Sequence, residues 1–291
     1  MITIKNEFLT VTINAHGAEL TSVIDNHTGR ETLWQADPAV WGRHAPVLFP
    51  IVGALKNGEY TYDGQTYKMG QHGFARDHDF TVTEADDKHA VFTLQDSEAT
   101  RTNYPFAFTL TLTYTLENNN ISVRYHVTNP AADAPLYFSV GGHPGFRIPA
   151  TEDTAYTDYY MGFTPSKSHV TIPLSAAGID YAHRTLAATD VNQMISHETF
   201  KNDALIFALN GKTKFSLRSD KTSHGVSLTT EDAPFLGVWS AYPAQGDYVC
   251  IEPWWGIADT TDASGELTEK LGINKLAPGE VFDHGYQITI F

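Results

Sequence analysis

Four short segments of the 291-residue sequence place charged or imidazole side chains among glycines and aromatic residues, where packing alone would not require them. They span residues 71–76, 141–146, 250–256 and 41–50. His143 lies between glycines, which let backbone approach a ligand closely, and Pro144, which stiffens the loop. Glu252 follows an apolar run and precedes two tryptophans. An imidazole and a carboxylate are side chains that general acid–base catalysis uses.

The tryptophans beside Glu252 bear on the kind of ligand. The aromatic faces of Trp254 and Trp255 would stack on the apolar faces of sugar rings, and by excluding water they would raise the pKa of the carboxylate. A structural reading stays open for each residue. Most of the thirteen histidines are expected to be structural or at the surface, a glutamate at a strand end is usually solvated, and either tryptophan fits a core equally well.

Other chemistries lack their usual motifs. The sequence has no H-E-x-x-H or C-x-x-C pair, so no local pattern supports a metal site. It also has no G-x-S-x-G elbow, P-loop or dinucleotide fingerprint after a strand. We therefore expect proton transfer without a metal or a cofactor.

Charge and composition restrict the partners. Nineteen basic and thirty-four acidic residues give a net charge of −15, which repels nucleic acid and anionic membranes but not a neutral small molecule. Cys250 is the only cysteine, so no intrachain disulfide is possible. The N-terminal residues do not resemble a signal peptide, and the most apolar stretch, 45–55, is far shorter than the roughly 18 residues of a membrane helix. These features favour a cytoplasmic protein.

The elements that must position these residues are expected to be strands. Apolar residues alternate with threonine or alanine over 106–116 and, after a polar turn at 117–120, alternate again over 121–127, which predicts an antiparallel hairpin. Similar runs occur at 3–13, 59–67, 90–94, 214–217, 225–229, 248–252 and 287–291, whereas 150–202 is irregular. No long segment has helical periodicity and no linker divides the chain. We expect an all-β fold, a large antiparallel β-sandwich with few short helices, in a single domain over 1–291.

At the chemical segments the chain resembles the aldose 1-epimerase (galactose mutarotase-like) family, and in particular its LacX-like bacterial branch. The motifs HGFAR at 72–76, GGHPGF at 141–146 and CxEPWxG at 250–256 occur in the family's order, and the resemblance spans nearly the whole chain. It implies the same β-sandwich and a mutarotase that needs no cofactor.

Residue by residue, the resemblance implies that His143 is the general acid and Glu252 the general base. It implies that His72 hydrogen-bonds the sugar near its ring oxygen and that Arg76 contacts the substrate. Asp203 lies where the family often holds sugar hydroxyls, and Arg43 matches an arginine of some branches. At their reference pKa values, about 4.3 and 6.5, the glutamate would be ionised and the histidine partly protonated.

The substrate is less defined by these motifs. A free hexose is our first expectation, but Arg43 and Arg76 also suit the phosphate of a hexose 6-phosphate, on which a related branch acts. The chain lacks the N-G-x-x-x-L-H-G-G form of galactose mutarotases proper, so a preference for galactose is not supported. A non-catalytic carbohydrate-binding protein is the competing class, because a fold does not establish activity. We expect a small-molecule sugar partner and a monomer or homodimer.

Overall fold

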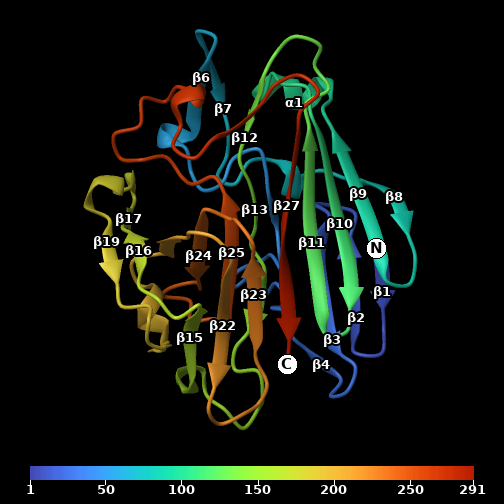
Figure 1. Ribbon diagram of the computed structural model, residues 1–291, viewed down its shortest axis with the longest axis vertical. Coiled ribbons are helices and arrows are strands. Elements are labelled where there is room, and N and C mark those ends of the chain that lie inside the picture. The colour runs from blue at the N-terminus through green and yellow to red at the C-terminus, as the bar shows by residue number, and fades with distance from the viewer.

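The computed structural model describes residues 1–291 and consists mostly of antiparallel strands, which confirms the expected all-β sandwich (Figure 1). Its larger sheet has nine strands. In spatial order they are β20 (Gln193–Met194), β15 (Tyr159–Thr164), β22 (Thr213–Ser219), β23 (Val226–Thr230), β27 (Val281–Ile290), β11 (Asn120–Thr128), β10 (Thr109–Glu117), β9 (His89–Gln95) and β8 (Thr81–Ala85).

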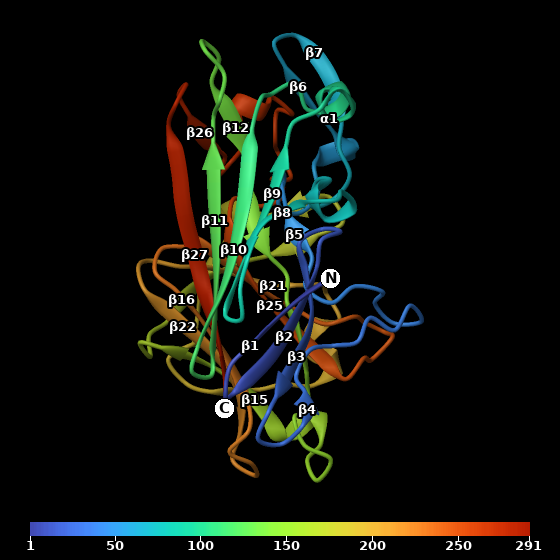
Figure 2. The same ribbon diagram turned by 90° about the vertical axis from the view of Figure 1, so that its right-hand side faces the viewer.

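The second sheet has eight strands and carries the chemical segments. In order they are β19 (Thr185–Ala187), β16 (His169–Ile172), β21 (Leu205–Ala208), β24 (Phe235–Trp239), β25 (Tyr248–Trp255), β13 (Val140–Gly142) and β5 (Val47–Leu48), and β14 (Gly145–Arg147) also pairs with β25. Figure 2, turned by 90°, shows β1, β2 and β3 of a further small sheet beside the long strands.

The remaining elements are short. The small sheet contains β1 (Ile2–Lys5), β2 (Leu9–Asn14), β3 (Glu19–Asp25) and β4 (Arg30–Glu31). Three strand pairs are β6 (Glu59–Tyr62) with β7 (Gln65–Lys68), β12 (Leu136–Phe138) with β26 (Asn274–Leu276), and β17 (Leu174–Ser175) with β18 (Gly178–Ile179). The only α-helix is α1 (Glu98–Asn103), and 3₁₀ turns span Lys56–Gly58, Ala75–Asp77, Tyr156–Asp158, Tyr181–His183, His197–Phe200 and Leu267–Glu269. No helix has the length and apolar character needed to cross a membrane.

The core lies between the two large sheets and follows from the period-two pattern. On β10, Leu110, Leu112 and Tyr114 are buried while the threonines between them are half-buried. They belong to a cluster of 60 buried residues that also takes in Val238 of β24 and Ile251 of β25, from the opposite sheet. Each such side chain stabilises the fold by roughly 1.5–3 kcal/mol when it is removed from water. The predicted hairpin is confirmed, with β10 and β11 paired from Glu117↔Asn120 to Thr109↔Thr128.

Two of the alternating runs each form a hairpin rather than one strand. The run at 59–67 is β6 and β7, joined by Asp63 and Gly64 with φ of 49° and 71°, the left-handed pair that a two-residue turn requires. The run at 3–13 is β1 and β2, where the Asn6 side chain accepts hydrogen bonds from the Phe8 and Leu9 amides. The irregular stretch 150–202 contains short strands and 3₁₀ turns, and its β15 joins the large sheet beside β22.

Candidate functional site

Strand β25 carries Glu252 in its interior. The expectation that this glutamate ends a strand is wrong, because β25 continues to Trp255. Side chains alternate between the two faces of a strand. Val249, Ile251 and Trp255 enter the main core, whereas Tyr248, Cys250 and Trp254 belong to separate clusters on the other face, which Glu252 shares by register. The Glu252 side chain is only 2% exposed, so it is not a solvated surface residue.

Pro253 explains how the strand can continue. The amide of Ile251 donates to the Pro144 carbonyl, 3.1 Å away, on the side where β13 and β14 pair with β25. The nitrogen of Pro253 lies on that same side, because positions two apart on a strand point the same way. Opposite Pro253, the segment that joins β13 to β14 does not pair with β25. Pro253, which has no N–H, therefore costs the sheet no hydrogen bond.

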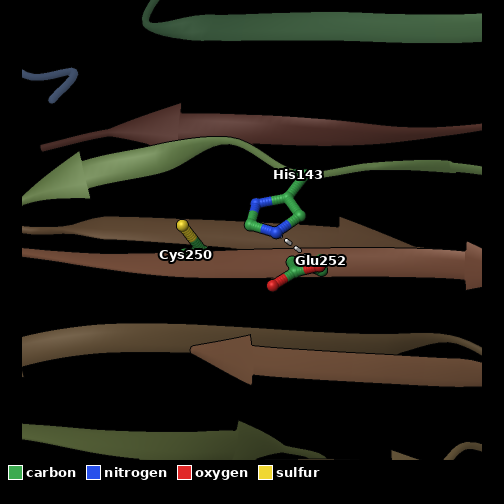
Figure 3. Close-up of side chains that lie close together, drawn as sticks. All are labelled: His143, Cys250 and Glu252. Atoms are coloured by element: carbon green, nitrogen blue, oxygen red, sulfur yellow. Dashed lines mark ion pairs between the residues drawn. The ribbon is translucent and has the colours of Figure 1, made fainter. Parts of the chain in front are cut away.

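His143 lies in this gap between β13 and β14, directly against Glu252. Its Nε2 atom is 3.2 Å from Oε2 of Glu252, and the two side chains are 9% and 2% exposed. Figure 3 shows the imidazole ring over β25, with Glu252 on one side and Cys250 on the other. The fold therefore brings the two residues within hydrogen-bond reach of one bound ligand.

Glycines on both sides let the His143 segment pack this closely. A Cβ on Gly142 would lie 2.6 Å from the Tyr286 hydroxyl, and one on Gly145 would lie 2.8 Å from the ring of Trp41. The Trp41 ring stacks on the imidazole of His143 at a centroid distance of 5.0 Å and an angle of 28°. Trp41 thus fixes the plane of the imidazole and shields it from water.

Burial sets the protonation of the pair. It lowers the pKa of His143 to about 3 and raises the pKa of Glu252 well above its usual value. Burial thus favours the uncharged form of both groups, a protonated carboxyl on Glu252 and a neutral imidazole on His143. Both shifts run against the expectation of an ionised glutamate beside a partly protonated histidine, because both charged forms lose their hydration.

His72 presents one defined tautomer to the cavity. The backbone amide of Gly53 donates to Nδ1 of His72 over 3.1 Å, so that nitrogen is an acceptor and the ring proton is on Nε2. Burial lowers the pKa of His72 well below its usual value, which keeps the ring neutral. Its ring meets that of His143 edge-on, with centroids 5.4 Å apart. His72 can therefore donate one hydrogen bond beside His143 and Glu252.

These side chains line one cavity of about 1250 Å³. Five of the six predicted site residues line it: His72, Arg76, His143, Asp203 and Glu252. Its aromatic lining includes Trp41, Trp239 and Trp254. Asp203 has a φ of 76°, and its Oδ1 accepts from the Ala204 amide at 2.8 Å. The cavity combines a buried imidazole–carboxyl pair, hydrogen-bonding groups and flat apolar surfaces.

Arg43 is the predicted site residue that does not line this cavity. Its Nη2 atom lies 2.8 Å from Oδ1 of Asp77, whose other oxygen is 3.8 Å from Nε of Arg76. Arg76 also donates from Nη2 to the Gln71 carbonyl over 2.7 Å. Asp77, one residue beyond the HGFAR motif, thus compensates both guanidinium groups.

Sequence reasoning missed Trp239 at the end of β24. Its ring lies 5.6 Å from Trp41 and 5.7 Å from His143, edge-on to both. A tryptophan that follows an apolar run has the same pattern as a core residue, so no local signal distinguishes it. The two tryptophans after Glu252 lie on opposite faces of β25, because side chains alternate along a strand. Trp255 lies in the main core and Trp254 in the cavity wall.

His143, Cys250 and Glu252 also form the one group of side chains whose arrangement approaches a metal site. Their ligand atoms lie within 4.8 Å of one another. A tetrahedral zinc ion with ligand bonds of about 2.0–2.3 Å would need the most widely spaced of these atoms to lie roughly 1 Å closer together. Burial also raises the pKa of the Cys250 thiol well above its usual value and so disfavours the thiolate that a metal needs. As arranged, the group is better suited to sharing a proton.

Comparisons with known proteins agree with one another on the family of this chain. Residues 1–273 match the family model described as aldose 1-epimerase. The chain is 32% identical over 298 residues to the plasmid-encoded protein LacX of Lactococcus lactis, covering 99% of each sequence. Among solved structures, a galactose mutarotase related enzyme from Lactobacillus acidophilus has a TM-score of 0.98 at 49% identity, over 100% of this chain and 97% of that one. A galactose mutarotase-like protein from Lactobacillus casei has a TM-score of 0.88 at 30% identity, over 100% of both chains.

Proposed function

This chain belongs to the aldose 1-epimerase family, and on that premise we propose that it is an isomerase that interconverts the α and β anomers of a free hexose. One observation carries the proposal: the buried His143 and Glu252 side chains lie 3.2 Å apart in the wall of a cavity large enough for a sugar. General acid–base catalysis needs such a donor and acceptor within reach of one substrate.

In the proposed reaction, Glu252 removes the proton of the anomeric hydroxyl while His143 protonates the ring oxygen. The bond between C1 and the ring oxygen breaks, C1 becomes a carbonyl, and rotation about C1–C2 exposes its other face. The reverse proton transfers close the ring. The Nε2–H of His72 supports ring opening by donating toward the ring oxygen, and Arg76 and Asp203 hold hydroxyl groups.

The burial of the pair supports this sequence of proton transfers. Ring opening leaves a protonated Glu252 and a neutral His143, which is the form that burial favours. Burial thus favours the same protonation state of the pair, a protonated Glu252 and a neutral His143, that exists when the sugar is in its open-chain form. To begin a cycle, the shared proton moves from Glu252 to His143 across their contact, which changes no net charge. Proton exchange within the pair therefore links the free protein to the reactive form.

Charge supports a neutral sugar as the substrate. Asp77 compensates Arg43 and Arg76, and the whole chain carries a net charge of −15. A phosphate at the cavity would need to compete with that carboxylate for the arginines. The tryptophan faces of the cavity suit the apolar face of a hexose ring.

Polarimetry of freshly dissolved α-glucose and α-galactose tests the proposal. We expect the protein to accelerate the approach to anomeric equilibrium for at least one free hexose. Faster equilibration of glucose 6-phosphate alone would identify the substrate as a sugar phosphate. Sugar binding in calorimetry without any acceleration would contradict the catalytic proposal and identify a carbohydrate-binding protein.

A further inference from the structure

The cavity wall behind His72 is a short backbone segment, residues 53–56. Gly53 contacts His72 twice, because its amide donates to Nδ1 over 3.1 Å and its carbonyl accepts from the His72 amide over 2.8 Å. His72 itself has a φ of 67°, an unfavourable conformation for a residue with a Cβ. The position and tautomer of its ring therefore depend on where this segment lies.

Asp259 holds the same segment from the opposite side. Its Oδ2 accepts from the Lys56 amide over 2.9 Å, and its own amide donates to the Ala54 carbonyl over 3.0 Å. The preceding residue, Ala258, packs closely against Gly53. A Cβ added to Gly53 would lie only 2.5 Å from the Cβ of Ala258. The segment is thus fixed between Asp259 and His72.

Lys270 in turn holds Asp259. Its Nζ lies 2.7 Å from Oδ1 of Asp259, and the two side chains are 3% and 6% exposed. The carboxylate thereby uses one oxygen for Lys270 and the other for the Lys56 amide. A buried ion pair loses much of its Coulombic gain to desolvation, so stability alone is a weak reason for placing one here. Its geometry defines where the carboxylate can lie.

We propose that Asp259, held by Lys270, is a positioning residue that fixes segment 53–56 and so keeps His72 as an Nε2–H donor facing the substrate. The inference rests on the proposed function for its catalytic consequence, but its structural part can be tested separately. Loss of the Asp259 acceptor should release the Lys56 amide, shift Gly53 and leave Nδ1 of His72 without its donor.

Two double variants isolate that acceptor. Asp259→Asn with Lys270→Met removes both buried charges but keeps an oxygen for the Lys56 amide, whereas Asp259→Ala with Lys270→Met removes the oxygen as well. The control is Lys221→Met. It breaks the ion pair of Lys221 with Asp158, which has the same length of 2.7 Å but lies at the surface, where the Lys221 side chain is 64% exposed. The readouts are the ¹⁵N signals of the His72 ring, assigned with a His72→Asn variant, and kcat and KM for the hexose.

We expect the asparagine variant and the control to keep the single Nε2–H tautomer and a kcat/KM within a few-fold of the starting protein. The alanine variant should show a mixture of tautomers and a kcat/KM lower by about 10- to 100-fold, as misplacement of a substrate-contacting group produces. Unchanged His72 signals in a folded alanine variant would overturn the proposal, and so would equal losses in both double variants. If the unaltered protein proves inactive on every sugar, the function proposal fails while the ¹⁵N signals still decide the positioning role.

Discussion

Nε2 of His143 and Oε2 of Glu252 lie 3.2 Å apart, and neither side chain is more than 9% exposed. They come from different parts of the chain, and the register of β25 against β13 and β14 brings them together. Burying such a pair costs free energy unless each partner satisfies the other. Its position in the wall of an open cavity gives it access to a ligand as well.

Replacing Glu252 by Gln should lower kcat for anomer exchange by at least about 100-fold, because the amide cannot accept the anomeric proton. Circular dichroism should show an unchanged fold. Glu231→Gln is the matched control, since that carboxylate is 67% exposed and pairs only with Lys212 at the surface. Turnover of Glu252→Gln close to that of this control would remove Glu252 from the mechanism.

His143 should make stability fall in acid. With a pKa of about 3 in the folded state and about 6.5 in the unfolded state, only the unfolded chain binds a proton at His143 between these values. The free energy of unfolding then decreases as the pH falls from 6.5 toward 3, by up to about 1.4 kcal/mol per pH unit from this group. Glu252 acts in the opposite sense, because its raised pKa means that the folded state holds its proton to higher pH.

The measurement is Tm between pH 7 and pH 4 for the unaltered protein and for His143→Gln. We expect Tm of the variant to fall less steeply with acid. His183→Gln is the control, because the side chain of His183 is 80% exposed. Parallel curves for the protein and for His143→Gln would show that His143 is not held neutral by burial.

Arg76 and Arg43 should differ in their importance for a free hexose. Arg76 lines the cavity, so Arg76→Ala should raise KM by roughly 10-fold or more through the loss of a charged hydrogen-bond donor. Arg43 lies outside it in a partly exposed pair with Asp77, so Arg43→Ala should change kcat/KM by no more than about threefold. Steady-state polarimetry of both variants distinguishes them. Equal losses would mean that Arg43 reaches the substrate after all.

Gly142→Ala should destabilise the fold. The added methyl group would lie 2.6 Å from the Tyr286 hydroxyl and 3.0 Å from that of Tyr125, within the packed interior. Overpacking of this kind typically costs about 1–3 kcal/mol. Urea denaturation should show the loss, whereas Gly70→Ala, where nothing lies within 4 Å, should leave the midpoint nearly unchanged. An unchanged urea midpoint for Gly142→Ala would mean that the two sheets can separate slightly at this position.

Local sequence patterns were enough to predict the fold class and to single out the segments around His143 and Glu252. Alternation along residues such as Leu110 and Leu112 records which face of a strand is buried, and that information is local. His143 and Glu252 were visible because their neighbours, glycines and tryptophans, are unusual for a strand or a turn. Asp63 and Gly64 are an equally local turn signal, and they divide the alternating run at 59–67 into β6 and β7.

Properties that depend on neighbours distant in the sequence became apparent only in the folded protein. The register of β25 buries Glu252 against His143, and burial shifts the pKa values of both residues toward their uncharged forms. Gly53 selects the tautomer of His72, and Arg43 pairs with Asp77 outside the cavity. These properties come from desolvation and from hydrogen-bond partners that no short segment specifies, because each partner is supplied by a different strand or loop.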